Sequence, residues 1–218
     1  MVPKSTYMKT LFCFFFAVII SLKISSCSGQ SNDALQKKYT VVNRTISTGT
    51  EVGSVHLSDA EGEGFAWINN EKFTYGTIEV DIKGKDKLQG SFVGIAFHGM
   101  NNSTCEIIYF RPFNFRSDDP LRKTHAVQYV APPDYSWEKL RQEYPGKYEQ
   151  PISPAPDPNE WFHARITVDS KSIKVYVNGN ATPSLVVEPL VHTEGTMIGL
   201  WTDTDGDWKN LKIIPASK

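Results

Sequence analysis

The fold is decided by residues 160–179, EWFHARITVDSKSIKVYVNG. Two runs of strand-forming residues meet here at Ser170 and Lys171, which predicts an antiparallel hairpin. Earlier in the chain, residues 77–83 (TIEVDIK) alternate isoleucine and valine with polar side chains. This period of two is typical of a strand with one wet face. Residues 91–99 (SFVGIAFHG) are apolar on both faces, and they predict a central strand covered on both sides.

Short runs of this kind, separated by glycine, asparagine and proline, follow one another from Tyr39 onward. We expect about twelve strands and no βαβ alternation. One helix is predicted over residues 134–144, where Asp134 or Ser136 can cap it and the side chains that recur at helical spacing are Trp137, Leu140, Arg141 and Tyr144. The predicted fold is all-β, a two-sheet antiparallel sandwich with one short helix.

Length and charge limit the function classes. The chain has 218 residues, enough for one sizeable core, with 24 acidic side chains against 23 basic ones. This balance supplies no electrostatic argument for nucleic acid or for an anionic membrane surface. We therefore expect no nucleic-acid partner.

The N-terminus has the layout of a signal peptide. Lys4 and Lys9 precede the apolar run LFCFFFAVIISL, and residues 24–27 (ISSC) resemble the bacterial lipobox, in which the cysteine is lipidated. The prediction is a lipoprotein signal peptide over residues 1–27 with lipidation at Cys27, the alternative being an ordinary secretory peptide. Translation could equally start at Met8.

The rest of the predicted domain organisation follows from this leader. Residues 28–38 are polar and predict a tether, and residues 39–215 predict the sandwich domain. Cys105 would then be the lone cysteine of the mature domain, which predicts a buried, inert thiol. The expected location is the cell envelope, where the protein would be lipid-anchored in the outer membrane or face the periplasm. The lipid anchor would be its only contact with a membrane.

Residues 105–144, CEIIYFRPFNFRSDDPLRKTHAVQYVAPPDYSWEKLRQEY, concentrate aromatic, arginine, amide and histidine side chains. Arg111 could bind adjacent hydroxyls or a uronate bidentately, or instead pair with Glu106, Asp118 or Asp119. Gln128 suits hydroxyl recognition or could tie down a loop, and large aromatics could stack on pyranose faces or simply pack. The candidate ligand-binding residues are Tyr109, Arg111, Asn114, Gln128, Tyr129, Tyr135, Trp137 and Arg141.

Two segments carry a family resemblance. Residues 73–99 (FTYGTIEVDIKGKDKLQGSFVGIAFHG) and the closing runs EWFHARITVDSKSIKVYVNG and GTMIGLWTDTDGDWKNLKI resemble the concanavalin A-like lectin and glucanase fold, as in laminin-G-like domains and the 3-keto-disaccharide hydrolase domains of bacterial lipoproteins. The resemblance covers residues 64–214. It implies that the fold is a two-sheet antiparallel jelly-roll sandwich (concanavalin A-like) whose concave sheet holds sugars. For the second family it also implies a hydrolase or lyase acting on oxidised sugars. The usual N-terminal pattern of that family, L-F-N-G-x-x-L-x-x-W, is missing.

The resemblance also bears on catalysis. Laminarinase-like enzymes carry E-x-D-x-x-E on one concave strand, and retaining cleavage needs two carboxylates about 5 Å apart. Here Glu106 matches the first acid, but Ile108 stands at the second acid position and no acid stands at the third. Laminarinase-type cleavage is therefore not expected, and Glu106 and His125 are the candidate catalytic residues for another chemistry.

Residues 203–207 (DTDGD) resemble part of a calcium loop but lack its full spacing. We expect a polar turn and no metal or other cofactor, with a structural calcium as the alternative. The function predicted from the sequence is a lipoprotein that binds a glycan or oligosaccharide on the concave face. One alternative is a glycoside hydrolase or lyase acting on a glycan or 3-keto-disaccharide. The other is a structural or protein-binding lipoprotein, so whether the chain is an enzyme stays open.

Overall fold

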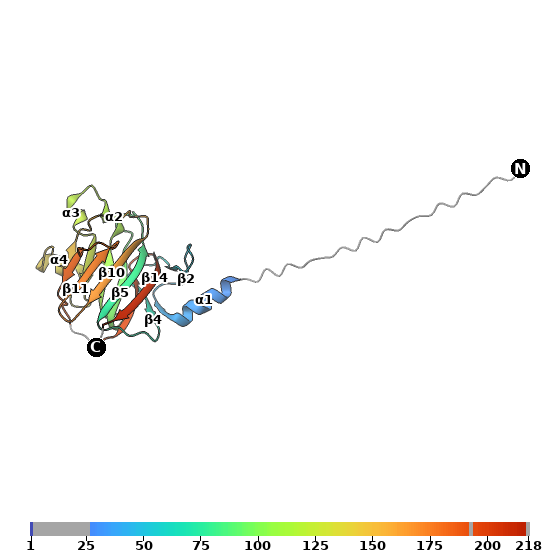
Figure 1. The fold of residues 1–218 in the computed structure, drawn as a ribbon, viewed down its shortest axis with the longest axis horizontal. Coiled ribbons are helices and arrows are strands. Elements are labelled where there is room, and N and C mark those ends of the chain that lie inside the picture. The colour runs from blue at the N-terminus through green and yellow to red at the C-terminus, as the bar shows by residue number, and fades with distance from the viewer. Residues whose placement is uncertain (2–26, 192–193, 217–218) are drawn as a thin grey trace.

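The computed structural model describes residues 1, 27–191 and 194–216, and within them it is a β-sandwich (Figure 1). Two antiparallel sheets, each of seven strands in the described residues, pack face to face. The predicted two-sheet antiparallel sandwich is confirmed. The leader ahead of Cys27 lies outside the described residues.

We call the two layers the front sheet and the back sheet. The front sheet has the order β1 (Tyr39–Val42), β4 (Gly64–Ile68), β13 (Met197–Thr202), β6 (Val93–Asn101), β7 (Thr104–Phe110), β8 (Val127–Val130) and β9 (Glu149–Gln150). The back sheet has the order β12 (Leu185–Val187), β11 (Ile173–Val177), β10 (Phe162–Val168), β5 (Gly76–Lys83), β14 (Gly206–Pro215), β3 (Val55–Leu57) and β2 (Ile46–Thr48). The strands β2 and β9 were not predicted, because runs of three and two residues are too short to show a period.

The helices are short. The predicted helix is present as α4 (Trp137–Glu143), where the Ser136 hydroxyl accepts from the Lys139 N–H. Two further turns, α2 (Pro112–Phe115) and α3 (Pro120–Lys123), each begin with a proline, which suits a first helical position. The stretch expected as a tether lies in α1 (Cys27–Lys38). In the described part of the chain, no helix has the length and apolarity needed to cross a bilayer.

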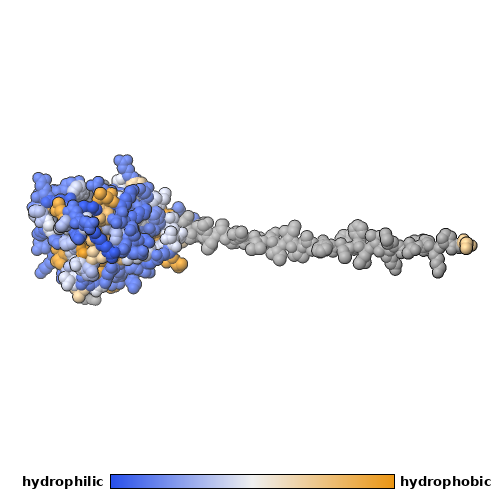
Figure 2. All heavy atoms as spheres, turned by 90° about the horizontal axis from the view of Figure 1, so that it is seen from above, coloured by the Kyte–Doolittle hydropathy of each residue, from blue (hydrophilic) through white to orange (hydrophobic). Residues whose placement is uncertain are grey.

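Strand alternation builds the core between the two sheets. In β5 the side chains of Ile78, Val80 and Ile82 are fully buried, whereas the residues between them are partly exposed, as the period of two predicted. The rings of Phe110 in β7 and Phe162 in β10 lie 4.9 Å apart and join the sheets. The face of the sandwich drawn in Figure 2 is largely hydrophilic, with separated hydrophobic groups.

The same alternation sorts the side chains of β7. Phe110 points between the sheets, so Ile108 and Glu106 point there too, and Tyr109 points to the opposite, outer face of the front sheet. In β8, Gln128 lies directly opposite Tyr109 in the antiparallel register, and Tyr129 lies opposite Ile108. Tyr109 and Gln128 therefore share the outer face.

Candidate functional site

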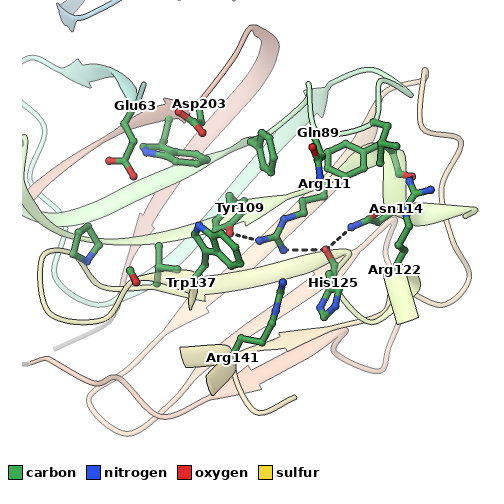
Figure 3. Close-up of a pocket in the computed structure, with 17 residues that line it drawn as sticks. Glu63, Gln89, Tyr109, Arg111, Asn114, Arg122, His125, Trp137, Arg141 and Asp203 are labelled. Atoms are coloured by element: carbon green, nitrogen blue, oxygen red, sulfur yellow. Dashed lines mark hydrogen bonds between the residues drawn. The ribbon is translucent and has the colours of Figure 1, made fainter. Parts of the chain in front are cut away.

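A cavity of about 600 Å³ lies over the outer face of the front sheet (Figure 3). Of the 17 described residues that line it, 11 fall within residues 109–141, so one stretch of chain builds most of its wall. The rest come from Glu63, the β5–β6 loop and the end of β13. No strand of the back sheet contributes a described lining residue.

The floor of the cavity is a hydrogen-bonded group of three side chains. One Arg111 N–H group donates to the Tyr109 hydroxyl (2.5 Å) and to the Gln128 Oε1 (2.6 Å). The Tyr109 hydroxyl in turn donates to the same Gln128 oxygen (3.0 Å). The guanidinium also lies 4.8 Å from the centre of the Tyr109 ring. These contacts hold Arg111 in one place beneath the cavity.

A buried carboxylate anchors one side of this floor. Glu149 accepts two hydrogen bonds from Arg141 (2.8 and 2.7 Å) in the bidentate geometry that guanidinium and carboxylate favour. Its Oε2 is also 2.8 Å from His125 Nδ1 and 3.8 Å from an Arg111 Nη1. Burial alone would raise the pKa of Glu149, but Arg141, His125 and Arg111 outweigh it and hold that pKa below its ordinary value.

The proton of His125 can be located from these contacts. Burial, helped by the charges of Arg141 and Arg111, lowers the pKa of His125 despite the opposing charge of Glu149. The imidazole is therefore neutral at pH 7. Because a carboxylate only accepts, the proton lies on Nδ1, and Nε2 keeps a lone pair. His125 lines the cavity, and its Nε2 has no hydrogen bond to any described residue.

The opposite end of the cavity is acidic, with Glu63 and Asp203 (Figure 3). Burial first and the charge of Asp203 second raise the pKa of Glu63, with the nearby Trp201 indole acting in the other direction. Burial also raises the pKa of Asp203, opposed by Arg44. The Trp201 indole nitrogen is buried and meets no described acceptor at hydrogen-bond geometry.

Aromatic rings make the remaining walls. Trp137 keeps 42% of its surface exposed, and the Arg141 guanidinium lies 4.9 Å from its ring centre. Trp201 packs against Tyr109 at 5.0 Å, and Phe92 meets Phe113 edge to face at 5.4 Å. An exposed ring held beside fixed polar groups is the arrangement that ligand sites use.

The structure brings together most of the residues singled out from the sequence. Tyr109, Arg111, Asn114, His125, Trp137 and Arg141 all line the cavity, and Gln128 supports its floor. Tyr135 does not line it and lies under the ammonium of Lys139. Tyr129 is fully buried and points between the sheets.

Glu106 also lies between the sheets, on the face of β7 opposite the cavity. It is fully buried, accepts from the Tyr129 hydroxyl and contacts His98 Nδ1. The backbone N–H of Leu190 donates to the Tyr129 hydroxyl at 3.1 Å. This geometry is that of a core polar cluster, and it places the candidate acid away from the candidate base His125.

Several functional residues were not predicted. The carboxylate beside Arg111 is Glu149 instead of Glu106, Asp118 or Asp119, and the pairing of β9 with β8 brings it there.

The three acids of residues 203–207 have different surroundings: Asp203 lines the cavity, Asp205 pairs with Lys85, and Asp207 pairs with His56. No group of three or more metal-ligating side chains occurs in residues 27–191 and 194–216.

Comparison with known proteins gives a family and a fold. Residues 27–214 match the sequence profile of the 3-keto-alpha-glucoside-1,2-lyase-like domain. Among proteins of curated function, none matches the chain.

Solved structures with the same architecture include carbohydrate-binding module CBM66 from Bacillus subtilis (18% identity, TM-score 0.56, covering 80% of this chain and 93% of that one). They also include the exoplasmic/lumenal domain of VIP36 bound to calcium and Man3GlcNAc (10% identity, TM-score 0.51, 83% and 86%). A third is the Bacillus licheniformis beta-glucanase (15% identity, TM-score 0.50, 82% and 87%). At these identities the likeness establishes the concanavalin A-like, glucanase-like sandwich.

Proposed function

The chain belongs to the family of 3-keto-alpha-glucoside-1,2-lyase-like domains, and from this premise we propose that its cavity binds a carbohydrate. The observation that carries the proposal is the combination of an exposed Trp137 ring with a fixed Tyr109–Arg111–Gln128 group in one cavity. The cavity volume of about 600 Å³ falls within the ordinary range for small-molecule sites.

The chemistry of a sugar matches this cavity. A pyranose presents apolar C–H faces, which gain energy by covering an aromatic ring, and the half-exposed Trp137 offers one. Its hydroxyls both donate and accept, so they need fixed partners of both kinds. Arg111 supplies donors whose direction Tyr109 and Gln128 set, and the acids Glu63 and Asp203 supply acceptors.

We propose as a second candidate that the bound sugar is also cleaved, because the cavity contains a poised base. In a 3-keto-glycoside the ketone acidifies the hydrogen on C2. His125 Nε2 could take this proton while Glu149 holds Nδ1–H, in the manner of an oriented general base. The C2–H electrons would form the C1–C2 double bond, the C1–O bond would break, and the leaving oxygen would take up a proton.

The test is to offer the purified protein an array of polysaccharides and a 3-keto-glucoside, with binding and product release assayed in the same wells. Binding that weakens in Trp137→Ala would support the carbohydrate site, since that half-exposed ring can be removed without opening the core. Turnover that His125→Asn abolishes while binding persists would support the lyase. A folded protein that shows neither binding nor product release would overturn the proposal, and binding of a protein partner would then be the remaining function.

We also propose that the protein is a lipoprotein of the cell envelope, anchored through Cys27. The support is the order of the residues: two lysines, an apolar run, and then ISSC at residues 24–27. In bacterial cells, labelled fatty acid should enter the protein and Cys27→Ser should abolish the label. Label that persists in Cys27→Ser would contradict the anchor.

A further inference from the structure

The cavity separates its charges along its length. Figure 3 shows Glu63 and Asp203 at one end, and Arg122 at the other, with Arg111 and Arg141 nearer to it. We call the end that carries Arg111, Arg122 and Arg141 the cationic end. His125, which lies among these arginines, is neutral at pH 7 because its pKa is lowered by burial.

Arg122 is held in place by neutral groups. Its Nε donates to the Asn114 Oδ1 (3.2 Å), and its Nη2 donates to the backbone carbonyl of Phe113 (2.8 Å). Asn114 is itself buried, and its amide donates to the backbone carbonyl of His125 (3.2 Å). The guanidinium further lies 6.0 Å from the Phe113 ring centre. The side chain is therefore positioned, with Nη1 left for another acceptor.

The charge of Arg122 is not compensated within the protein. Among the described residues, no carboxylate forms an ion pair with it. Arg111 and Arg141 share a single carboxylate, that of Glu149. Three guanidiniums thus face one carboxylate at the cationic end, and that carboxylate is buried beneath them. A partly desolvated excess of positive charge attracts an anion more strongly than the same charge in open water.

We propose that the cationic end binds the carboxylate of an acidic sugar, so that the ligand is a glycan that contains a uronic acid. This inference rests on the proposed carbohydrate site and specifies its ligand class. A guanidinium and a carboxylate form strong, directed hydrogen bonds, and Arg122 lines the cavity in a fixed orientation with its Nη1 group making no hydrogen bond to a described residue. Glu63 and Asp203 repel an anion from the other end, which fixes the direction in which the ligand lies.

The experiment measures binding of the full chain by calorimetry to four acidic polysaccharides: polygalacturonate, alginate, hyaluronan and glucuronoxylan. Each is offered beside its own carboxyl-reduced form, which keeps the linkages and removes the charge. The variant is Arg122→Gln, which removes the charge but keeps a polar side chain. The control is Arg116→Gln, which removes an equal charge from an exposed pair with Asp157 outside the cavity lining.

We expect at least one acidic polymer to bind roughly ten- to a hundredfold more tightly than its reduced form, as a hydrogen-bonded charge pair supplies. Arg122→Gln should remove most of this preference, and Arg116→Gln should leave the binding of both forms unchanged. Added salt should weaken only the acidic ligand.

The other outcomes separate the two proposals. Equal binding of acidic and reduced polymers would overturn the uronate inference and leave the carbohydrate site standing. A preference for the acid that survives in Arg122→Gln would overturn the role given to Arg122. No binding to any of the eight polymers, with neutral glycans also silent, would overturn the carbohydrate site and the inference together.

Discussion

Replacing Glu149 by glutamine should destabilise the protein by about 3 kcal/mol. One carboxylate oxygen accepts from Arg141 Nε, and the other accepts from Arg141 Nη2 and His125 Nδ1. An amide has a single oxygen, so it can occupy only one of these two positions. The amide nitrogen would then face donors. At best the amide keeps the two contacts of Oε2 and loses the Arg141 Nε bond, and it also removes the negative charge that faces Arg141 and Arg111. Removing one partner of a buried ion pair costs about 3–5 kcal/mol. The Arg141 side chain is 35% exposed, so solvent screening brings the figure to the lower end of this range.

The measurement is urea unfolding of the wild type and the variant at pH 7, followed by tryptophan fluorescence. The matched control is Asp157→Asn, since Asp157 and Arg116 form a pair of similar length whose side chains are 43% and 54% exposed. That change should cost less than about 1 kcal/mol. If Glu149→Gln costs no more than Asp157→Asn, then Glu149 does not hold the cavity floor together, and the reasoning fails.

Three further predictions concern single side chains. Trp137→Ala should leave stability within about 1 kcal/mol because the ring is 42% exposed, whereas Leu140→Ala on the same helix, at 1% exposure, should cost about 2–5 kcal/mol in urea unfolding. Burial raises the pKa of the Cys105 thiol to about 12, so with Cys13 and Cys27 replaced by serine a thiol reagent at pH 8 should label the unfolded protein only, and rapid labelling of the native protein would contradict the buried position. In an NMR titration His125 should titrate below about 6.5 and His98 above it, because hydrogen bonds outweigh burial at His98, and the reverse order would refute both assignments.

The signs of the two histidine contributions to stability differ. His98 has a raised pKa in the folded state, so its contribution is complete below about 6.5 and is lost as the pH rises through that raised value. His125 has a lowered pKa, so folding opposes its protonation and its contribution falls as the pH drops below about 6.5. Glu149 also makes the protein less stable in acid, because its pKa is lowered in the folded state. Its stabilisation is complete above its ordinary pKa and is lost as the pH falls through the lowered value.

Most strands could be predicted because each shows its hydrophobic pattern over a continuous run of residues. The alternation of residues 77–83 reappears in β5, and the hairpin of residues 160–179 is the β10–β11 pair. The two strands that escaped, β2 and β9, are three and two residues long. β2 pairs with the next strand β3, and β9 pairs with β8 across α4, but neither short run carries a local pattern that reports its pairing.

The candidate site was predicted unevenly for the same reason. Arg111, His125 and Trp137 belong to one stretch of unusual composition, and the fold gathers them around one cavity. Strand parity separates Glu106 from Tyr109, since residues three apart on a strand face opposite sides, although both were candidate site residues within residues 105–144. Glu149 could not be found locally, because it meets Gln128 only through the register of β8 with β9.

The wall of the cavity is built mainly by residues 109–141, whereas the strands of the back sheet contribute no described lining residue. The cavity thus depends on the front sheet and on the segment that follows β7, and the back sheet can keep its packing while the cavity changes. Mutations in the connection between β7 and β8 and in α4 can alter what the cavity accepts while the rest of the sandwich stays intact. This stretch is a natural unit for exchange between relatives. A chimera that keeps the sheets and imports another member's loop and helix should inherit the donor's ligand preference.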